Sequence, residues 1–456
     1  MSDSTGSTVP LAFPTLPSKP MNLWEFIRRL RENSVSIYPR SSFSEPFSTR
    51  TALFQHFVLL NDPELIQHVL LTHQENYPKG RLNRQILGRV LGSGLLTSEG
   101  EFWRRQRRIA APAFHHRRLV ALADVMSEAC ARLAADWQRR AGSQVDMLHE
   151  MMQLTMDIVT RALFSADVAD DAEELGAAIT RLLDGFGSPS MVDLIGLPEW
   201  LPRSRDAEAQ AAIRYVEDRL YRIIAERRSG AVKRDDLLQM LLDSRDEETG
   251  EGMSDKQLRD ELFTLFAAGH ETTANALTWT WYLLALHPDV ENRLQGEVDD
   301  VLQGRLPAFD DLDRLPYSRM VFEESMRLYP PAFSTSRVAR EEDRIDDYVI
   351  PKGAIVTLSP WVTHRNPNLW PDPERFDPER FAPGRQRERH KFAYFPFGGG
   401  PRVCIGNAFA LMEGRLALAI LSSGIRPRLL PGHVVEPMGR ITLRPRGGLP
   451  MILEPR

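Results

Sequence analysis

The stretch FPFGGGPRVCIGNAF, residues Phe395–Phe409, places one of only two cysteines of the chain between a run of glycines and a predicted helix. Three consecutive glycines permit a tight loop with backbone angles that other residues rarely adopt. Cys404 then lies at the expected N-terminus of the helix, where the helix dipole and free N–H groups favour the thiolate over the thiol. Because the thiolate is the form that binds metals, the stretch predicts a metal ligand.

The setting of Cys404 narrows the choice of metal. A single cysteine with no neighbouring Cys or His does not suit zinc, which takes about three or four protein ligands. A nucleophilic cysteine needs a base; no motif supplies one, although a base from a distant part of the chain stays open. An iron that already has four equatorial ligands needs only one more, so haem with an axial thiolate fits best. The remaining alternative, a buried small hydrophobic residue, is the interpretation of Cys130.

Bulk composition describes an ordinary globular protein. The chain has 456 residues, 42% hydrophobic and 26% charged, with a net charge of −5, which gives no bulk attraction to nucleic acid or to anionic membranes. Two cysteines cannot form a disulfide framework, the proline-containing start lacks the apolar core of a signal peptide, and no apolar run is long enough for a membrane span. We therefore expect a cytoplasmic protein.

One long central helix is predicted from Ser254, which forms a capping box with Gln257, to the helix-ending Pro288. Its middle, AAGHETTANA (Ala267–Ala276), is polar and contains a glycine, although a glycine inside a helix costs roughly 1 kcal/mol relative to alanine. One interpretation is a kink with a satisfied polar patch.

The other interpretation of this helix is functional. Gly269 would let another group approach the backbone, while Glu271 and Thr272 would form a proton-handling pair beside it. These residues alone slightly favour the kink.

Several other segments bear on the architecture. Glu324 and Arg327 stand three apart on one helix face. Short β-prone runs follow and predict a small sheet. The proline-rich segment after them is irregular, and Arg375 and Arg380 are suited to bind its backbone carbonyls. An apolar stretch at residues 186–204, FGSPSMVDLIGLPEWLPRS, is equally well a mobile lid or a packed surface loop.

Five motifs, which follow one another along the chain in the family's order, resemble those of the cytochrome P450 family of haem-thiolate monooxygenases. FGGGPRVCIG (Phe397–Gly406) matches the ligand-loop signature F-x-x-G-x-R-x-C-x-G at every fixed position. AGHETT matches the oxygen-site motif, ESMR matches E-x-x-R, FDPERF matches the later arginine-containing segment, and WRRQR matches the W-x-x-x-R of an early helix. The motifs extend from about Trp103 to the C-terminus. The start of the chain and the AGHETT motif resemble the soluble bacterial members.

The resemblance implies a mainly α fold with a smaller β-rich part, in which haem b lies between the central helix and the helix after the cysteine loop. It implies one haem domain over residues 1–456, with residues 1–50 partly irregular and no fused reductase. Cys404 would be the axial iron ligand, with Phe397 beside the sulfur. Arginines and the Trp103 indole would hold the two haem propionates. The residues assigned to the cofactor are Trp103, Arg107, Ala268, Gly269, Arg337, Phe397, Arg402, Cys404 and Gly406.

The same resemblance implies the catalytic roles. Thr272 would contact dioxygen and Glu271 would help deliver protons, so that one oxygen atom enters a hydrophobic organic substrate. Glu324, Arg327 and Arg380 would form a structural ion-pair network. By analogy the pocket would include Phe263, Ala267, Ala332 and Phe333. A haem-thiolate peroxygenase or isomerase and a non-catalytic haem sensor are the alternatives, and neither class needs the acid–threonine pair.

The sequence has no flavin or iron–sulfur domain and no nucleotide fingerprint. We therefore expect a monomer that receives electrons from a separate ferredoxin or flavodoxin, reduced by an NAD(P)H-dependent reductase. A basic cluster is either its docking site or an ordinary solvated helix face. The members of this cluster are Arg104, Arg105, Arg108, His115, His116, Arg117 and Arg118.

Overall fold

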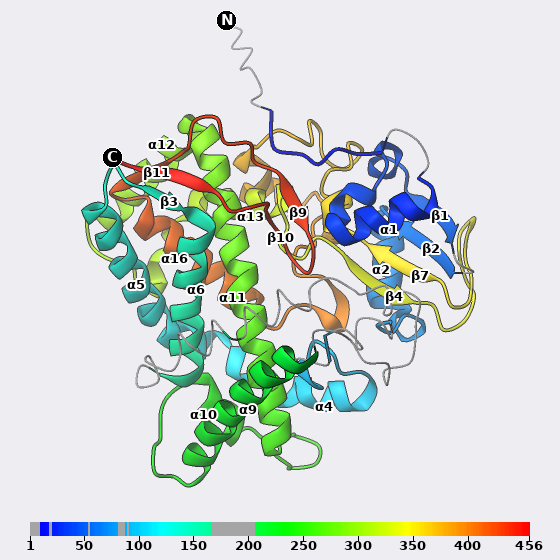
Figure 1. Cartoon of the computed structure of the whole chain (residues 1–456), viewed down its shortest axis with the longest axis horizontal. Coiled ribbons are helices and arrows are strands. Elements are labelled where there is room, and N and C mark those ends of the chain that lie inside the picture. The colour runs from blue at the N-terminus through cyan, green and yellow to red at the C-terminus, as the bar shows by residue number, and fades with distance from the viewer. Residues whose placement is uncertain are drawn as a thin grey trace, which may run out of the picture.

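The computed structural model describes residues 10–17, 21–52, 55–80, 87–88, 91–165, 178 and 206–456. Helices dominate these residues and the strands form small sheets, so the predicted fold class is confirmed (Figure 1). The predicted apolar lid at residues 186–204 lies outside the described part of the chain.

The longer helices follow one another through most of the described chain. They are α1 (Leu23–Glu32), α4 (Gly100–Ala110), α5 (His116–Arg139), α6 (Met147–Phe164), α9 (Asp206–Arg228), α10 (Leu237–Asp243), α11 (Asp255–Leu286), α12 (Pro288–Leu302), α13 (Pro316–Leu328) and α16 (Asn407–Leu421). Shorter α-helices are α2 (Pro63–Gln67), α14 (Pro360–Thr363) and α15 (Pro383–Gln386). None of the helices in the described ranges is both long and apolar enough to cross a bilayer.

Within the described residues, the strands form four separate sheets. They are β1 (Phe47–Ala52), β2 (Gln55–Leu60), β3 (Gln144–Asp146), β4 (Thr335–Val338), β5 (Asp343–Ile345), β6 (Tyr348–Ile350), β7 (Ile355–Leu358), β8 (Ile425–Leu429), β9 (Pro437–Gly439), β10 (Leu443–Pro445) and β11 (Pro450–Pro455). The largest sheet has the order β1-β2-β7-β4, in which only β2 and β7 are parallel, and β3-β11-β8 form a second sheet. The hairpins β5-β6 and β9-β10 make up the rest.

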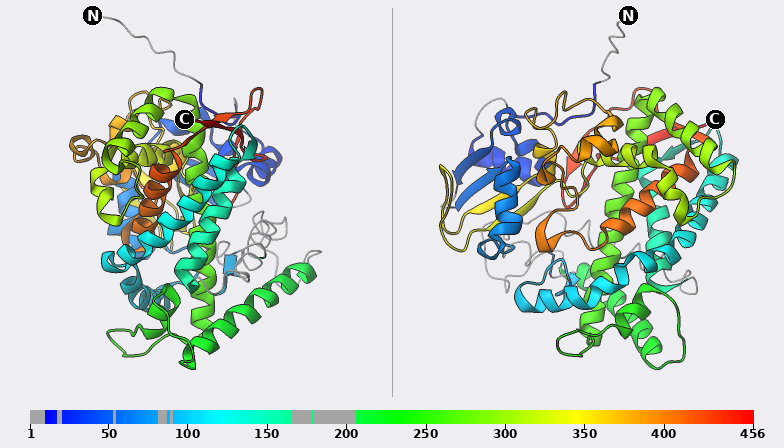
Figure 2. Two further views of the ribbon diagram at one scale, coloured as in Figure 1. Left: turned by 90° about the vertical axis from the view of Figure 1, so that its left-hand side faces the viewer. Right: turned by 180° about the vertical axis from the view of Figure 1, so that it is seen from behind.

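Helix α11 is the axis of the molecule. It begins with the capping box predicted at Ser254 and Gln257 and ends at Leu286, two residues before Pro288. In Figure 1 it runs between a group of helices that includes α5, α6 and α16 and the sheet that contains β1, β2, β4 and β7, and the view from behind in Figure 2 shows the same division. The polar middle of α11 therefore lies deep within the molecule.

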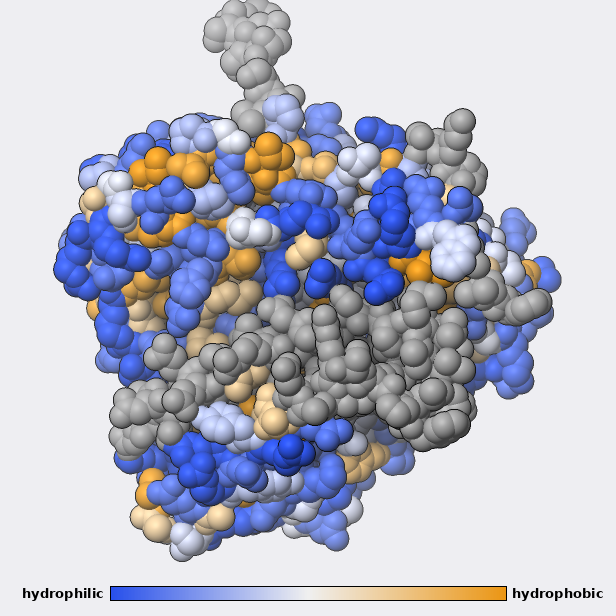
Figure 3. Space-filling view, in the orientation of Figure 1, coloured by the Kyte–Doolittle hydropathy of each residue, from blue (hydrophilic) through white to orange (hydrophobic). Residues whose placement is uncertain are grey.

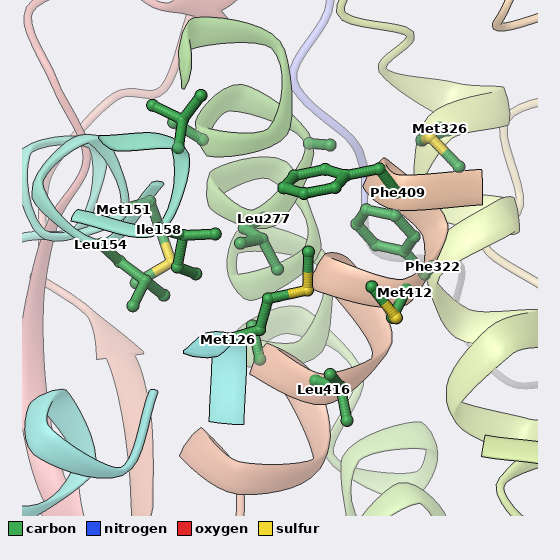
Figure 4. Close-up of a cluster of buried hydrophobic side chains, with 14 of the residues drawn as sticks. Met126, Met151, Leu154, Ile158, Leu277, Phe322, Met326, Phe409, Met412 and Leu416 are labelled. Carbon is green, nitrogen blue, oxygen red and sulfur yellow. The ribbon is translucent and has the colours of Figure 1, made fainter. Parts of the chain in front are cut away.

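The helical core packs around α11. Figure 4 shows methionine, leucine and phenylalanine side chains from α5, α6, α11, α13 and α16 converging in one cluster. Helix α6 comes close to α11, because a Cβ on Gly269 would lie 3.2 Å from Val159 Cγ2. Thr155 of α6 donates a hydrogen bond of 3.0 Å to the His270 carbonyl. Part of the reason for Gly269 is thus the close approach of α6 to α11.

The proline-rich segment after α14 is held by side chains from α13. The fully buried Arg327 donates to the carbonyls of His364, Pro373 and Arg375 at 2.8 to 3.0 Å. Glu324 accepts two hydrogen bonds from the same guanidinium, at 2.7 and 2.8 Å. A buried charge needs this kind of complete pairing to be tolerated.

Arg375 and Arg380 also lie in this proline-rich segment. Arg380 Nε lies 3.5 Å from Glu324 Oε1, and its Nη2 donates to the Asp372 carbonyl. Arg375 contributes its backbone carbonyl to Arg327. The irregular segment thus depends on Glu324, Arg327 and Arg380, the set expected from the sequence.

Away from this interior, most of the described surface visible in Figure 3 is hydrophilic, with one group of hydrophobic residues on the side of the helical core.

Candidate active site

The cysteine loop is shaped by its glycines. Gly398 and Gly400 have φ angles of 72° and 64°, in the region that glycine adopts without strain. A Cβ on Gly400 would collide with the Leu70 carbonyl, and one on Gly399 would collide with the Phe392 ring. The loop closes through a 2.9 Å hydrogen bond from the Cys404 N–H to the Phe397 carbonyl.

Cys404 does not lie within the following helix. Helix α16 begins at Asn407 with Gly406 as its N-cap, so the cysteine precedes the cap by two residues. Burial raises the pKa of the Cys404 thiol, while the Gly406 N–H and the Arg107 guanidinium lower it in part. The N–H groups at the helix end therefore favour the thiolate, but desolvation of the thiol outweighs them. A metal cation would supply the missing positive charge.

The surroundings of Cys404 leave room for a bulky group. The residue is exposed even though protein atoms crowd the thiol, as at the floor of a hollow. A Cβ on Gly406 would meet no atom within 4 Å. The start of α16 thus lies beside an open space.

Helix α11 is partly exposed at its AGHETT motif. Ala268 is exposed, although its neighbour Ala267 and the nearby His270 are buried. Gly269 and Thr272 are half-buried, and the Thr272 hydroxyl donates to the Ala268 carbonyl at 2.7 Å. A short stretch of this otherwise buried helix therefore faces open space, with a hydroxyl at its edge.

Two arginines assigned to the propionates have no ion-paired acid among the described residues. Arg337 is 7% exposed and donates to the Thr335 hydroxyl and the Ser336 carbonyl, both at 2.9 Å. Burial lowers the pKa values of Arg337 and Arg107. Within the described ranges, neither guanidinium has a carboxylate at ion-pair distance. Such groups fit an anionic ligand.

The third arginine has an acidic partner. Arg402 Nη2 lies 2.9 Å from Glu99 Oε2, and Nη1 donates to the Ser98 carbonyl at 2.9 Å. Its guanidinium also lies 3.8 Å from the centroid of the buried Trp103 ring, a cation–π contact. Arg402 and Trp103 therefore form one unit before any cofactor binds.

Lys79 adds a cation to this group. Its Nζ donates to the Leu96 carbonyl at 2.5 Å, and its backbone N–H donates to Glu99 Oε1 at 3.3 Å. Burial, together with the charges of Arg402 and Arg337, lowers the pKa of Lys79 to about 7. A recessed thiol, an open helix start and a cluster of desolvated cations fit a flat cofactor that carries carboxylates.

The comparisons identify the family. Residues 21–432 match the family model for Cytochrome P450. The chain belongs to the cytochrome P450 family. It is 39% identical over 396 residues to cyclooctatin synthase and 38% identical over 399 residues to cyclooctat-9-en-7-ol 5-monooxygenase, both from Streptomyces melanosporofaciens. Each match covers 86% of this chain and 85% of the relative.

A solved structure supports the same family assignment. The crystal structure of the cytochrome P450DA heme domain matches with a TM-score of 0.81 at 28% identity, over 90% of both chains. This P450 is therefore a haem-thiolate monooxygenase with haem b as its cofactor and dioxygen as a substrate, and it depends on a redox partner. Cys404 is the cysteine of the matched signature.

The four predicted pocket residues divide into two groups. Ala332 is exposed and Ala267 is 8% exposed. Phe263 is fully buried with the Arg259 guanidinium 5.0 Å from its ring centroid, and Phe333 is 5% exposed. Both rings are thus buried, and their place in the substrate pocket stays a prediction.

The predicted basic cluster on α4 and α5 is largely neutralised. Arg105 and Arg108 both pair with Asp246, and Arg104 pairs with Glu75 and Glu101. Glu251, Glu248 and Asp235 pair with Arg105, Arg108 and Arg118. The side chains of His116 and Arg117 lie outside the described set. Because acids screen these cations, the structure favours a solvated face over a docking site.

Four residues near the motifs were missed by the sequence interpretation: Lys79, Glu99, Asn275 and Thr442. Glu99 and Lys79 carried only a weak signal, since each is a charged residue beside a turn or motif. Thr442 lies on a distant hairpin, and no local pattern connects it to α11.

Proposed function

We propose that this P450 hydroxylates a hydrophobic, hydrocarbon-rich substrate such as a terpene alcohol. The observation that carries the proposal is the open stretch of α11, where the apolar Ala268 is exposed beside the half-buried Gly269 and Thr272. The exposed Ala332 adds apolar surface. The relative named cyclooctat-9-en-7-ol 5-monooxygenase acts, by its name, on an alkenol, which supports this substrate class.

The cofactor-binding residues would divide the work. Cys404 would ligate the iron, Arg107, Arg337 and Arg402 would neutralise the cofactor carboxylates, and Trp103 would pack against Arg402. Phe397, Gly269 and Gly406 would shape the space on either side. These assignments rest on the matched motifs together with the unpaired cations described above.

The bound haem supplies reductive activation of dioxygen: two electrons and two protons are consumed, one oxygen atom enters the substrate, and the other leaves as water. Thr272 would orient dioxygen through its hydroxyl, at the edge of the open stretch. Glu271, its neighbour, would pass protons from solvent toward that side. A peroxygenase, isomerase or sensor would not need this pair, so its presence argues against those alternatives.

A separate acidic carrier, a ferredoxin or flavodoxin with its NAD(P)H-dependent reductase, would supply the electrons to a monomeric, cytoplasmic enzyme. On this P450, the carrier would dock at the segment that precedes the cysteine loop. Arg385, Arg387 and Lys391 are exposed there, and within the described residues no acid pairs with them. Lys391 precedes Phe392, whose ring packs at Gly399 of the loop. An acidic surface bound here would lie next to the cysteine ligand.

Two spectroscopic measurements test the ligand and the substrate class. The reduced protein with carbon monoxide should show the strongly red-shifted Soret band of thiolate ligation, and Cys404→Ala should lose it. A panel of terpene alcohols, steroids, fatty acids and small aromatic compounds would then be titrated while the haem spin state is followed. Incorporation of an atom from labelled dioxygen into the best binder would establish hydroxylation. A spin-state response only to charged, water-soluble compounds would contradict the proposed class.

Charge reversal tests the docking segment. The double variant Arg385→Glu/Arg387→Glu should raise the KM for a plant-type ferredoxin, most strongly at low salt, without altering the carbon monoxide spectrum. Arg104→Glu/Arg105→Glu, in the acid-paired cluster, is the matched control and should have the smaller effect. A larger increase in KM for the control variant would instead place the docking site on α4.

A further inference from the structure

The carboxylate of Glu271 is in contact with the C-terminal part of the chain. Its Oε1 accepts a hydrogen bond from the hydroxyl of Thr442, which lies 171 residues away in sequence. Thr442 is 6% exposed and directly precedes β10 in the β9-β10 hairpin. The acid of the oxygen-site motif is therefore tied to a second element.

The direction of this hydrogen bond follows from its other partner. Asn275 is fully buried on α11, and its Nδ2 donates to the same Thr442 oxygen at 3.0 Å. A hydroxyl has a single proton, so with its oxygen accepting from Asn275 it keeps that proton for Glu271. The chain Asn275 to Thr442 to Glu271 thus directs one donor at the carboxylate.

The backbone around Thr442 is also fixed to α11. The buried Trp279 donates from Nε1 to the Leu443 carbonyl at 3.0 Å, and the Leu443 N–H donates to the Pro331 carbonyl at 3.0 Å. Glu271, Asn275 and Trp279 are spaced four residues apart, so they form one row on the helix. Asn275 and Trp279 of this row thus bind the hairpin through two hydrogen bonds, in addition to the one between Thr442 and Glu271.

We propose that Thr442 is a positioning residue for proton delivery, which holds the Glu271 carboxylate in one orientation and joins it to the β9-β10 hairpin. The inference rests on the proposed role of Glu271. A glutamate has several rotatable bonds, and a fixed donor removes orientations in which the carboxylate points away from its proton acceptor. If protons are not delivered at the required position, the reduced oxygen leaves as hydrogen peroxide. Its formation consumes two electrons and two protons per dioxygen.

The test measures hydrogen peroxide released per NADPH consumed by the haem-loaded enzyme with a plant-type ferredoxin and its reductase. This ratio needs no known substrate, because the remaining electrons form water. Thr442→Val should raise the ratio by about twofold or more and enlarge the solvent deuterium isotope effect, whereas Thr442→Ser keeps a hydroxyl and should restore both. Thr280→Val is the matched control, since among the described residues this buried α11 hydroxyl bonds to its own helix, at the Ala276 carbonyl.

The double variant separates positioning from a purely structural role. If Thr442 acts through the acid, adding Thr442→Val to Glu271→Gln should leave the peroxide ratio of Glu271→Gln unchanged. Additive effects, or an unchanged ratio in Thr442→Val, would overturn the inference while Glu271→Gln still raised the ratio. If Glu271→Gln itself leaves the ratio unchanged, the proposed role of Glu271 fails, and the positioning role of Thr442 with it.

Discussion

Glu99 and Arg402 form an ion pair in which Oε2 lies 2.9 Å from Nη2, on the cation that the family motif assigns to a cofactor carboxylate. Both side chains are largely covered, with 26% and 14% of their surface exposed. Arg402 is also held over Trp103 and bonded to the Ser98 carbonyl. The arginine is thus oriented by protein groups before the cofactor arrives, and this preorganisation reduces the cost of binding.

This pair makes a prediction for a double-mutant cycle. Glu99→Gln and Arg402→Gln should each destabilise the protein, and the double variant should lose less than the sum, with a coupling energy of about 0.5 to 3 kcal/mol. Denaturant unfolding of the four proteins measures it. In the same set, haem should be lost on dilution most readily from the variants that lack Arg402, and to a smaller extent from Glu99→Gln. Additive free energies would mean that Glu99 does not hold Arg402.

Arg327 should be the most sensitive position outside the cofactor site. Arg327→Lys removes a bidentate buried pair with Glu324 and three carbonyl contacts, so the free energy of unfolding should fall by roughly 3 to 5 kcal/mol, with loss of bound haem. Arg319→Lys on the same helix is the control, because its contact with Glu323 is 3.9 Å long and partly exposed. Its expected cost is about 0 to 1 kcal/mol. Equal losses would show that burial of the Glu324 pair carries no special weight.

Local signals account for what the sequence predicted well. The bounds of α11 follow from a serine–glutamine capping box and a proline, which act within one or two helix turns. The glycines of the cysteine loop likewise record close contacts with Leu70 and Phe392. Such residues carry their structural reason in their own neighbourhood.

Contacts between distant segments were beyond the sequence. Thr442 reaches Glu271 across 171 residues, and periodicity holds no trace of that pairing. Analogy placed Phe263 and Phe333 on the pocket side, but the depth at which both rings are buried could not be read from the sequence. The thiol of Cys404 was judged from its helix end, whereas the opposing burial appears only once the fold surrounds it.

Glu413 should make stability depend on pH. It lies in α16 with 1% exposure, and burial raises its pKa to about 8, partly offset by the Thr273 hydroxyl. Unfolded, the same group titrates near its ordinary value of 4.5. Between these values the folded chain keeps a proton that the unfolded chain loses, so stability falls as pH rises, by about 1.4 kcal/mol per pH unit.

Glu413→Gln removes this titration. Urea unfolding of the haem-loaded protein at several pH values between 5 and 8 should therefore give a shallower decline for the variant than for the wild type. Glu261, whose pKa burial also raises to about 8, remains in both proteins and cancels in the comparison. Parallel pH profiles would show that Glu413 is ionised in the folded state.

Lys79 should take up a proton when the cofactor binds. Its pKa of about 7 means that it is mostly neutral at pH 8, whereas cofactor carboxylates bound by Arg337 and Arg402 would favour the charged form. Titration of haem into the haem-free protein, by calorimetry in two buffers of different ionisation enthalpy, counts the protons. At pH 8 the wild type should take up nearly one proton more than Lys79→Met, which cancels the release from Cys404 common to both. At pH 5.5 Lys79 is already protonated, so the difference should vanish. A difference that is absent at pH 8 would place Lys79 away from the cofactor carboxylates.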